Sequence, residues 1–351
     1  MPCTGTEITD LAAGTYYVRV AETATKKPSE MAEIRVSGAV SDLQISKKRL
    51  QLQDTIAIDF IVSKTELDGK YHDPYLAVTQ NGIMRILKEY GESGDSLVFT
   101  YRVTPQMLDD AVIAVPHAMN ASGGDVAGEA LKYSVTEYCY NMLSKDEYQE
   151  EKYATFRRLL VDILRYGDAA QTYKGYKTGE LASRNLTSAQ KAMGTDVNAV
   201  QTYNTVKEQN YKTVSSADKL AEIKSATLFL EAAVNIRFGI SVDSTADAAD
   251  LRVVITDNAE CTNVIAEYRL NAQQVSGGLY CVDVNKLNAG QMKKTIYATV
   301  KKGDKAVSNT YRYSIESYVN SKRTDSGTNL DKLLDAMMRY GNTAADYVAG
   351  R

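Results

Sequence analysis

Two histidines are the first side chains to consider for catalysis in this chain. His72 lies in GKYHDPY, a segment rich in turn-forming residues, and His117 follows Pro116 at the end of a predicted strand. A structural zinc site would need clustered Cys and His ligands, and neither histidine has a cysteine nearby in the sequence. We therefore expect two surface histidines, no bound metal and no cofactor.

Cysteine chemistry is limited by spacing, because no CxxC pair occurs among the four cysteines. They are Cys3, Cys139, Cys261 and Cys281. A disulfide between Cys261 and Cys281 and two separate thiols both fit the sequence, and separate buried thiols are the simpler interpretation.

Carboxylate and nucleophile motifs do not single out a reaction. Asp243, Asp247 and Asp250 form an acidic run, but their spacing is not that of an EF-hand, so a solvated loop is the simpler interpretation. No H-E-x-x-H, Walker loop or G-x-S-x-G motif occurs. The paired carboxylates of a glycosidase are set by tertiary distance and cannot be located from sequence. We expect a protein without catalytic residues, and a hydrolase with dispersed carboxylates remains an alternative.

Tyrosine dominates the aromatic residues, with 24 tyrosines, 5 phenylalanines and no tryptophan. A tyrosine ring offers apolar area with a polar tip, so an exposed one can stack against a sugar. Tyr71, Tyr75, Tyr203 and Tyr211 are the candidate ligand-binding residues. The competing interpretation is that these four are ordinary half-buried tyrosines.

One helical pattern occurs twice and organises the whole chain. LLVDILRYGDAAQTY at 159–173 and LLDAMMRYGNTAADY at 333–347 share apolar positions at helical spacing. A helix-interior glycine costs about 1 kcal/mol relative to alanine, so its recurrence predicts close approach of a neighbouring element. The repeated structural motif comprises Arg165, Tyr166, Gly167, Arg339, Tyr340 and Gly341. Packing is the favoured interpretation of this motif, and a paired Arg-Tyr ligand site is the alternative.

The duplication extends into the strands before each helix. ISKKRLQLQDTIAIDFIVS from Ile45 aligns without a gap with IKSATLFLEAAVNIRFGIS from Ile223, and both alternate apolar with polar residues. LDDAVIAV from Leu108 aligns with MKKTIYATV from Met292. YSVTEYCYNML, beginning at Tyr133, predicts a strand that leads into a helix. Each copy is therefore predicted to be a set of short strands followed by helices.

These repeats define the predicted organisation, an α+β, β-rich fold of two tandem β-sandwich (Ig-like) units, each followed by a C-terminal helical hairpin. Residues 41–180 form the first copy and 216–351 the second, joined by a partly helical linker at 181–215. Within the linker, LTSAQKAM predicts a short helix capped by Thr187 or Ser188. Residues 1–40 predict an N-terminal β-hairpin or the tail of a preceding repeat, and NASGGDVAGEA (120–130) predicts a long hairpin loop.

Composition excludes several classes of function. The chain has 351 residues, 44% hydrophobic and 24% charged residues, and a net charge of −3, all ordinary for a soluble globular protein. A basic surface for nucleic acid is not expected. No apolar run approaches the roughly 18 residues of a membrane span, and no signal peptide is expected at Met1.

A resemblance adds an expected location. ITDLAAGTYYVRVAETA resembles the L-x-x-G-T-Y-Y-V-R strand ends of repeat modules in large surface proteins of Gram-positive gut bacteria. YSVTEYCYNML, LLVDILRYGDAAQTYKGYKTGELA and LTSAQKA together resemble a module of secreted and wall-attached Firmicutes proteins. Such modules accompany dockerins, carbohydrate-active enzymes or wall-sorting signals. The resemblance implies a secreted or cell-surface location and transfers no catalytic residue.

The expected function is a non-catalytic extracellular module that serves as a structural spacer or adhesion segment. The alternative is a carbohydrate-binding module for plant polysaccharide, starch or a host glycan. Expected partners are a glycan or another surface protein, and we expect a monomer within a larger polypeptide. An exposed planar row of aromatic residues would favour the glycan binder, and two facing carboxylates in a cleft would favour the enzyme.

Overall fold

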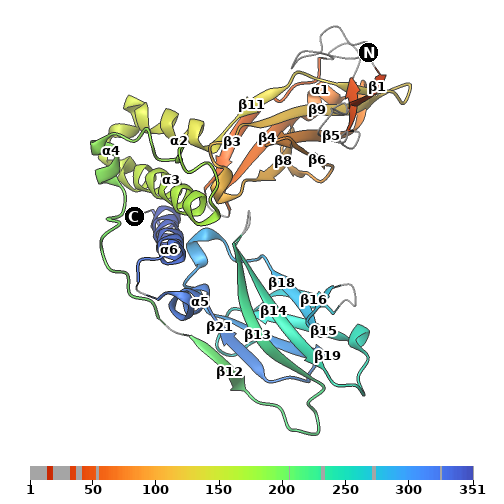
Figure 1. Cartoon of the computed structure of the whole chain (residues 1–351). Coiled ribbons are helices and arrows are strands. Elements are labelled where there is room, and N and C mark those ends of the chain that lie inside the picture. Colours follow the sequence, from red (N-terminus) through yellow and green to blue (C-terminus); the bar gives the residue numbers. More distant parts are fainter. Residues whose placement is uncertain are drawn as a thin grey trace, which may run out of the picture. The chain divides into compact units, whose positions relative to one another are not determined.

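The computed structural model of the chain describes residues 14–18, 32–36, 42–52, 55–204, 206–230, 234–270, 274–324 and 326–350 (Figure 1). Its contacts define two compact units. The first unit comprises residues 1–49, 58–101 and 110–133, and the second comprises 50–57, 102–109 and 134–351. The domain boundaries predicted from the sequence repeat differ from the boundaries of these units, which are defined by contacts between residues. Helices α2 (Val135–Ser144), α3 (Ala154–Lys174) and α4 (Ser188–Met193) therefore belong to the second unit, in which α3 packs along α6 (Asn329–Val348).

Antiparallel strands form the sheets of the first copy. One sheet has the order β3-β4-β8-β7, and the other has the order β10-β9-β5-β6 with β11 also paired to β9. The strands are β3 (Lys47–Gln51), β4 (Ala57–Ser63), β5 (Tyr71–Gln80), β6 (Ile83–Leu87), β7 (Gly91–Ser93), β8 (Ser96–Arg102), β9 (Val112–Asn120), β10 (Asp125–Ala127) and β11 (Leu131–Tyr133). A helical turn, α1 (Lys64–Leu67), joins β4 to β5, and a separate hairpin pairs β1 (Gly14–Val18) with β2 (Ala32–Val36).

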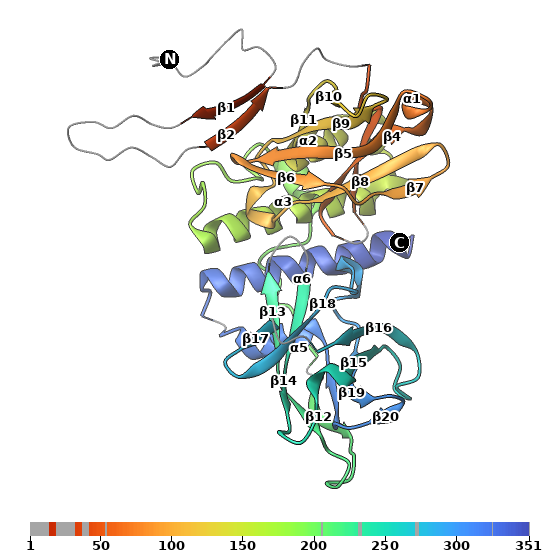
Figure 2. The same ribbon diagram turned by 90° about the vertical axis from the view of Figure 1, so that its right-hand side faces the viewer.

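The second copy repeats this arrangement with one additional strand (Figure 2). Its sheets have the orders β13-β14-β18-β17 and β12-β21-β19-β15-β16, with β20 paired to β19. The strands are β12 (Lys207–Lys212), β13 (Ala221–Leu230), β14 (Val234–Val242), β15 (Leu251–Thr256), β16 (Val264–Arg269), β17 (Val275–Ser276), β18 (Leu279–Val284), β19 (Ile296–Lys302), β20 (Lys305–Ala306) and β21 (Thr310–Tyr313). β12 comes from the linker and has no counterpart among the described strands of the first copy.

Buried side chains on the inner faces of the strands form the cores. Ile58 and Phe60 of β4 are fully buried, as are their repeat counterparts Ile236 and Phe238 of β14. In the second copy the Phe238 ring contacts Tyr311 of β21 at a centroid distance of 6.0 Å, so the two sheets pack against each other there. The predicted period-two alternation thus places its apolar residues in the core.

Helices follow the strands of each copy, as predicted. They are α2 (Val135–Ser144), α3 (Ala154–Lys174), α4 (Ser188–Met193), α5 (Ile315–Lys322) and α6 (Asn329–Val348). Ser134 caps α2 and Ser314 caps α5, each accepting a backbone N–H from the residue three positions later. Thr187 forms a capping box at α4, which confirms the predicted short helix in the linker.

The glycine of the repeated motif lies against an equivalent neighbour in both copies. A Cβ added at Gly167 would lie 2.8 Å from Leu108 Cδ1, and one added at Gly341 would lie 2.8 Å from Met292 Sδ. Leu108 and Met292 are themselves repeat counterparts, so the two contacts are the same contact made twice. The predicted close approach at these glycines is therefore confirmed.

Three local predictions need correction or qualification. His72 and Tyr75 lie within strand β5, and His117 lies within β9, so the segment GKYHDPY is not mainly turn. Pairing with the neighbouring strand overrides the local turn preference of its glycine, aspartate and proline. Residues 120–130 are not one long loop, because β10 pairs back onto β9 after a turn at Gly123, whose φ is +79°. Strands β1 and β2 pair antiparallel, as a hairpin within residues 1–40 requires, and the residues that connect them lie outside the described residues.

Candidate functional site

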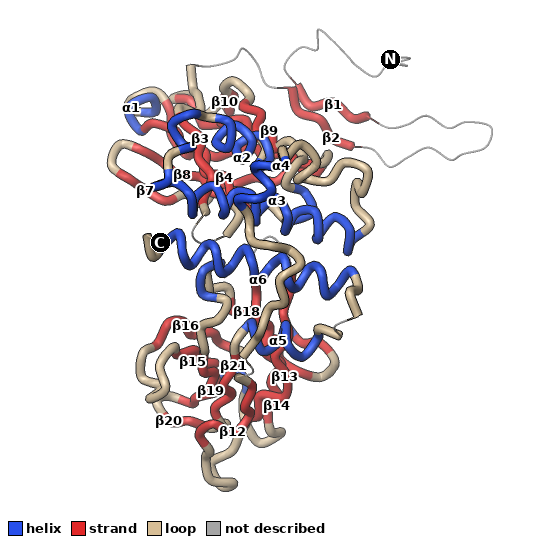
Figure 3. The backbone as a smooth tube through the Cα atoms, turned by 90° about the vertical axis from the view of Figure 1, so that its left-hand side faces the viewer, coloured by secondary structure: helices blue, strands red, loops and turns tan. Residues whose placement is uncertain are grey.

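The two repeated helices pack against each other within the second unit (Figure 3). Tyr166 of α3 stacks on Tyr340 of α6, with ring centroids 5.7 Å apart and planes 15° apart, and both rings are buried. Phe156, near the start of α3, contacts Tyr347, near the end of α6, so the helices are antiparallel. Tyr166 and Tyr340 occupy the same position in the repeat. Equivalent residues that stack on each other indicate a local two-fold relation between the helices.

Both repeated arginines bind the linker that joins the two copies. Arg165 donates hydrogen bonds from its two terminal nitrogens to the backbone carbonyls of Thr195 and Lys191. Arg339 donates in the same way to the carbonyls of Asp196 and Ala199. A guanidinium has several donors in a fixed fork, which suits it to hold two carbonyls at once. The arginines therefore fix the linker segment 191–199 on the two helices.

Asp162, absent from the predicted motif, joins three parts of this interface. Its carboxylate accepts hydrogen bonds from the Thr195 backbone N–H (3.0 Å), the Thr195 hydroxyl (2.7 Å) and the Thr343 hydroxyl (2.6 Å). The residue is 1% exposed, and Arg165 lies 3.9 Å from its carboxylate. Asp162 of α3 thus contacts both the linker and α6.

A cavity of about 320 Å³ lies between these helices and the linker. Charged side chains in its lining include Asp168 and Lys332. Burial raises the pKa of Asp168, against the opposing effect of hydrogen bonds donated by Ser183. The arginines and Asp162 also line this cavity, and all three are already bound to the linker.

Two of the candidate ligand-binding tyrosines make internal contacts. The Tyr203 hydroxyl donates to Asp335 at 2.5 Å, and burial raises the pKa of Tyr203 well above its usual range. The Tyr211 ring contacts Tyr297 at 4.9 Å and lies under the Arg312 guanidinium. Both rings therefore attach the linker and β12 to the second copy, in agreement with the half-buried interpretation.

The other two tyrosines lie on strand β5 of the first unit. The Tyr71 hydroxyl donates to Asp42 at 2.6 Å. The Tyr75 ring stacks on His117 at 4.8 Å, and its hydroxyl donates to Asp125 at 3.0 Å. The structure thus brings Tyr75 and His117 together from neighbouring strands, which the sequence did not indicate.

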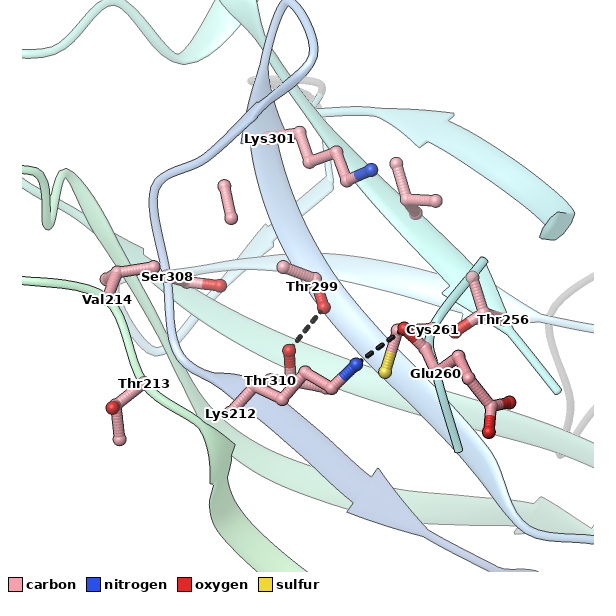
Figure 4. Close-up of a pocket in the computed structure, with 12 residues that line it drawn as sticks. Lys212, Thr213, Val214, Thr256, Glu260, Cys261, Thr299, Lys301, Ser308 and Thr310 are labelled. Carbon is pink, nitrogen blue, oxygen red and sulfur yellow. Dashed lines mark hydrogen bonds between the residues drawn. The ribbon is translucent and has the colours of Figure 1, made fainter. Parts of the chain in front are cut away.

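A second cavity, here called the threonine pocket, lies in the second copy and has a volume of about 300 Å³ (Figure 4). Strands β15, β19 and β21 and the β20–β21 connection contribute its hydroxyl groups, and the end of β12 and the β15–β16 turn contribute further residues. The side chains that define it are Lys212, Thr256, Thr299, Lys301, Ser308 and Thr310. Thr256, Thr299, Ser308 and Thr310 are all less than 9% exposed, so the pocket extends below the protein surface.

Contacts within the protein take up only part of the hydrogen-bonding capacity of the side chains in the threonine pocket. The Thr299 and Thr310 hydroxyls lie 2.8 Å apart, as the dashed line in Figure 4 marks. The Ser308 hydroxyl accepts the Val300 N–H at 2.8 Å. The Lys212 ammonium donates to the Glu260 backbone carbonyl. Among the described residues, Lys301 has no ion-pair partner within 4 Å.

The internal repeat shows that two of the pocket hydroxyls, those of Thr299 and Thr310, are specific to the second copy. Strand pairing places Thr299 where the first copy has Val115, because Ala298 and Ala114 are equivalent in both ladders. The same ladders place Thr310 where the first copy has Ala130. A residue-by-residue comparison of the two copies would reveal these hydroxyl residues from the sequence. Threonines on a strand match no catalytic motif, so motif patterns in the sequence do not indicate them.

The described cysteines are free thiols, so Cys261 and Cys281 are not bonded. Cys139 is fully buried, and burial raises the pKa of its thiol. Cys3 lies outside the described residues. Within the described part of the chain, no group of three or more His, Cys, Asp or Glu side chains has the arrangement of a metal site. Of the described helices, none is long and apolar enough to cross a membrane.

Comparisons with known proteins do not assign this chain to a family. No protein-family model matches it, and no curated protein is significantly similar to it. A solved structure of astrotactin-2, described as a conserved vertebrate-specific and perforin-like membrane protein involved in neuronal development, aligns at 7% identity and a TM-score of 0.17. That alignment covers 74% of this chain and 46% of astrotactin-2, so the chain spans less than half of that structure.

Proposed function

We propose that this chain is a non-catalytic structural segment of a cell-surface protein, in which two β-sandwich copies are joined through their helices. The main support for the proposal comes from the contacts that the residues of the repeated motif make. Tyr166 stacks on Tyr340, and Arg165 and Arg339 both bind linker carbonyls. Residues repeated in both copies thus join α3 of the first copy to α6 of the second and to the linker. The cell-surface location rests on the resemblance described above.

The order of the strands supports an immunoglobulin-like sandwich for each copy. Named A to G along the first copy, its sheets are A-B-E-D (β3-β4-β8-β7) and G-F-C-C′ (β11-β9-β5-β6). This is the arrangement of immunoglobulin domains. The second copy has the same two sheets, with β12 added beside its strand G. Antiparallel modules of this kind suit tandem arrays, since each buries its own core.

Limited proteolysis tests the structural role of the arginines. In the wild type, Arg165 holds the Lys191 carbonyl, so trypsin should cut slowly after Lys191. In the double variant Arg165→Ala/Arg339→Ala the linker loses four hydrogen bonds, and we expect cleavage there at least about tenfold faster, because cleavage follows local opening. Arg269→Ala, on the exposed surface of β16, is the control and should leave the rate unchanged. Equal rates in all three proteins would contradict the proposed joint.

A carbohydrate-binding module is the competing function, and it now depends mainly on Tyr71 and Tyr75 of β5. The assay is retention of the purified chain on insoluble starch, cellulose, xylan and mucin. The structural proposal expects no retention on any of them by folded protein. Retention that disappears in Tyr71→Ala/Tyr75→Ala, with an unchanged circular dichroism spectrum, would replace the structural proposal with the carbohydrate-binding one.

A further inference from the structure

The threonine pocket contains hydroxyl residues at positions where the first copy of the repeat has apolar residues. The first copy has the same strand ladders but carries Val115 and Ala130 where the second carries Thr299 and Thr310. Burying a hydroxyl in place of a methyl group costs free energy unless the hydroxyl is hydrogen-bonded. In the first copy Val115 is half-buried and Ala130 is exposed, whereas in the second copy Thr299 and Thr310 are buried and their hydroxyls bond to each other. The second copy thus gathers buried hydroxyl groups beside Lys212 and Lys301 where the first copy has apolar and more exposed residues.

The pocket supplies hydrogen-bond donors in excess. When the Thr299 and Thr310 hydroxyls bond to each other, one of their two hydrogens is used and the other remains available. Lys301 contributes an ammonium group with three donors. Lys212 contributes a second ammonium, of which the Glu260 carbonyl takes one hydrogen. Glu260 also lines the pocket, so the lining carries two positive charges and one negative charge, and the matching ligand is an acceptor with negative charge.

We propose that the threonine pocket binds a small oxyanion, either a phosphate or the carboxylate of a small molecule. The ammonium groups of Lys212 and Lys301 neutralise its charge, and the Thr299–Thr310 pair donates a hydrogen bond to it. Charge-assisted hydrogen bonds of this kind are about twice as strong as neutral ones. The volume of about 300 Å³ limits the ligand to a small molecule or a single group of a larger one. The site is separate from the α3–α6 interface, so it goes beyond the proposed structural function.

The test is a titration of the full ¹⁵N-labelled chain, followed by amide NMR, with inorganic phosphate, glucuronate and glucose in separate arms. Phosphate or glucuronate should shift amide signals of β19 and β21 at concentrations up to about 10 mM, where millimolar binding is detected. Glucose, which has no charge, should not. Shifts with both anions indicate a general oxyanion site, and shifts with one alone identify the source. Shifts with glucose as strong as those with glucuronate, or no shift with either anion, would overturn the proposal.

Three variants locate the binding. Lys301→Gln should weaken anion binding about tenfold through loss of one charge-assisted contact. Thr299→Val introduces the residue of the first copy, keeps the side-chain shape and should weaken binding several-fold without loss of folding. Lys302→Gln is the matched control, since its ammonium pairs with Asp250 rather than lining the pocket, and it should bind as the wild type does. An affinity that is unchanged in both Lys301→Gln and Thr299→Val would place the anion elsewhere and reject the proposal.

Discussion

Removal of the Asp162 carboxylate should destabilise the second unit by about 3 kcal/mol. The carboxylate accepts three hydrogen bonds, from the Thr195 N–H, the Thr195 hydroxyl and the Thr343 hydroxyl. Each hydrogen bond to a charged group contributes about 1.5–3 kcal/mol, so the gross loss is larger. Part of it is recovered, because Asp162→Ala also removes a buried charge, whose desolvation costs several kcal/mol.

A double-mutant cycle isolates the contact between the two repeated helices. Thr343→Val keeps the shape of the side chain and removes only its hydroxyl. We expect Asp162→Ala and Thr343→Val to be coupled by about 1.5 kcal/mol, the value of one hydrogen bond to a carboxylate. Asp162 and Thr343 belong to different copies of the repeat, so this coupling reports directly on the joint. Asp283→Ala, which removes a carboxylate bonded to Arg237, is the control and should be additive with Thr343→Val.

The assay is urea unfolding followed by the helical circular dichroism signal, with the free energy of unfolding taken from the midpoint and slope. Hydrogen exchange of the α3 and α6 amides localises the effect to these helices. A coupling energy below about 0.5 kcal/mol would lie within ordinary additivity, and it would mean that the Asp162–Thr343 bond does not hold the helices together in solution. The proposed joint would then lose its main support.

Three further results are expected. Gly290→Ala should destabilise the chain by about 1–3 kcal/mol in the same urea assay, because the new Cβ would lie 3.0 Å from backbone of α6, whereas Gly179→Ala, with open space around it, should be nearly neutral. Hydrogen bonds from the Thr324 N–H and neighbouring groups hold the pKa of Asp331 well below its usual range, so the stabilisation from this carboxylate is present above about pH 4 and lost as the pH falls further. The difference in unfolding midpoint between wild type and Asp331→Asn should therefore shrink as the pH falls below about 4. A constant difference would contradict the assignment. Alkylation with mass spectrometry should modify Cys261 in the native protein and Cys139 only after unfolding, since Cys139 is fully buried; equal rates would refute its burial.

The sequence by itself determined the repeated organisation and its local structure. The 3.6-residue spacing from Leu159 to Tyr173 predicted α3, and the equivalent spacing from Leu333 to Tyr347 predicted α6. Period-two alternation after Ile45 and Ile223 predicted the paired strands. These features depend on neighbours within a few residues, so they can be read from one stretch of chain. The capping box at α4 and the close approach at the repeated glycines are of the same kind.

Tertiary structure alone decided which repeated residues meet and what they hold. The sequence placed Tyr166 and Tyr340 far apart and gave no sign that they stack, because the pairing of two helices depends on the match of whole faces. It also gave Arg165 no partner, since backbone carbonyls of a linker carry no residue-specific signal. The threonine pocket was equally hidden. Its hydroxyls come from separate strands, and only the register of those strands brings Thr299 to within a hydrogen bond of Thr310.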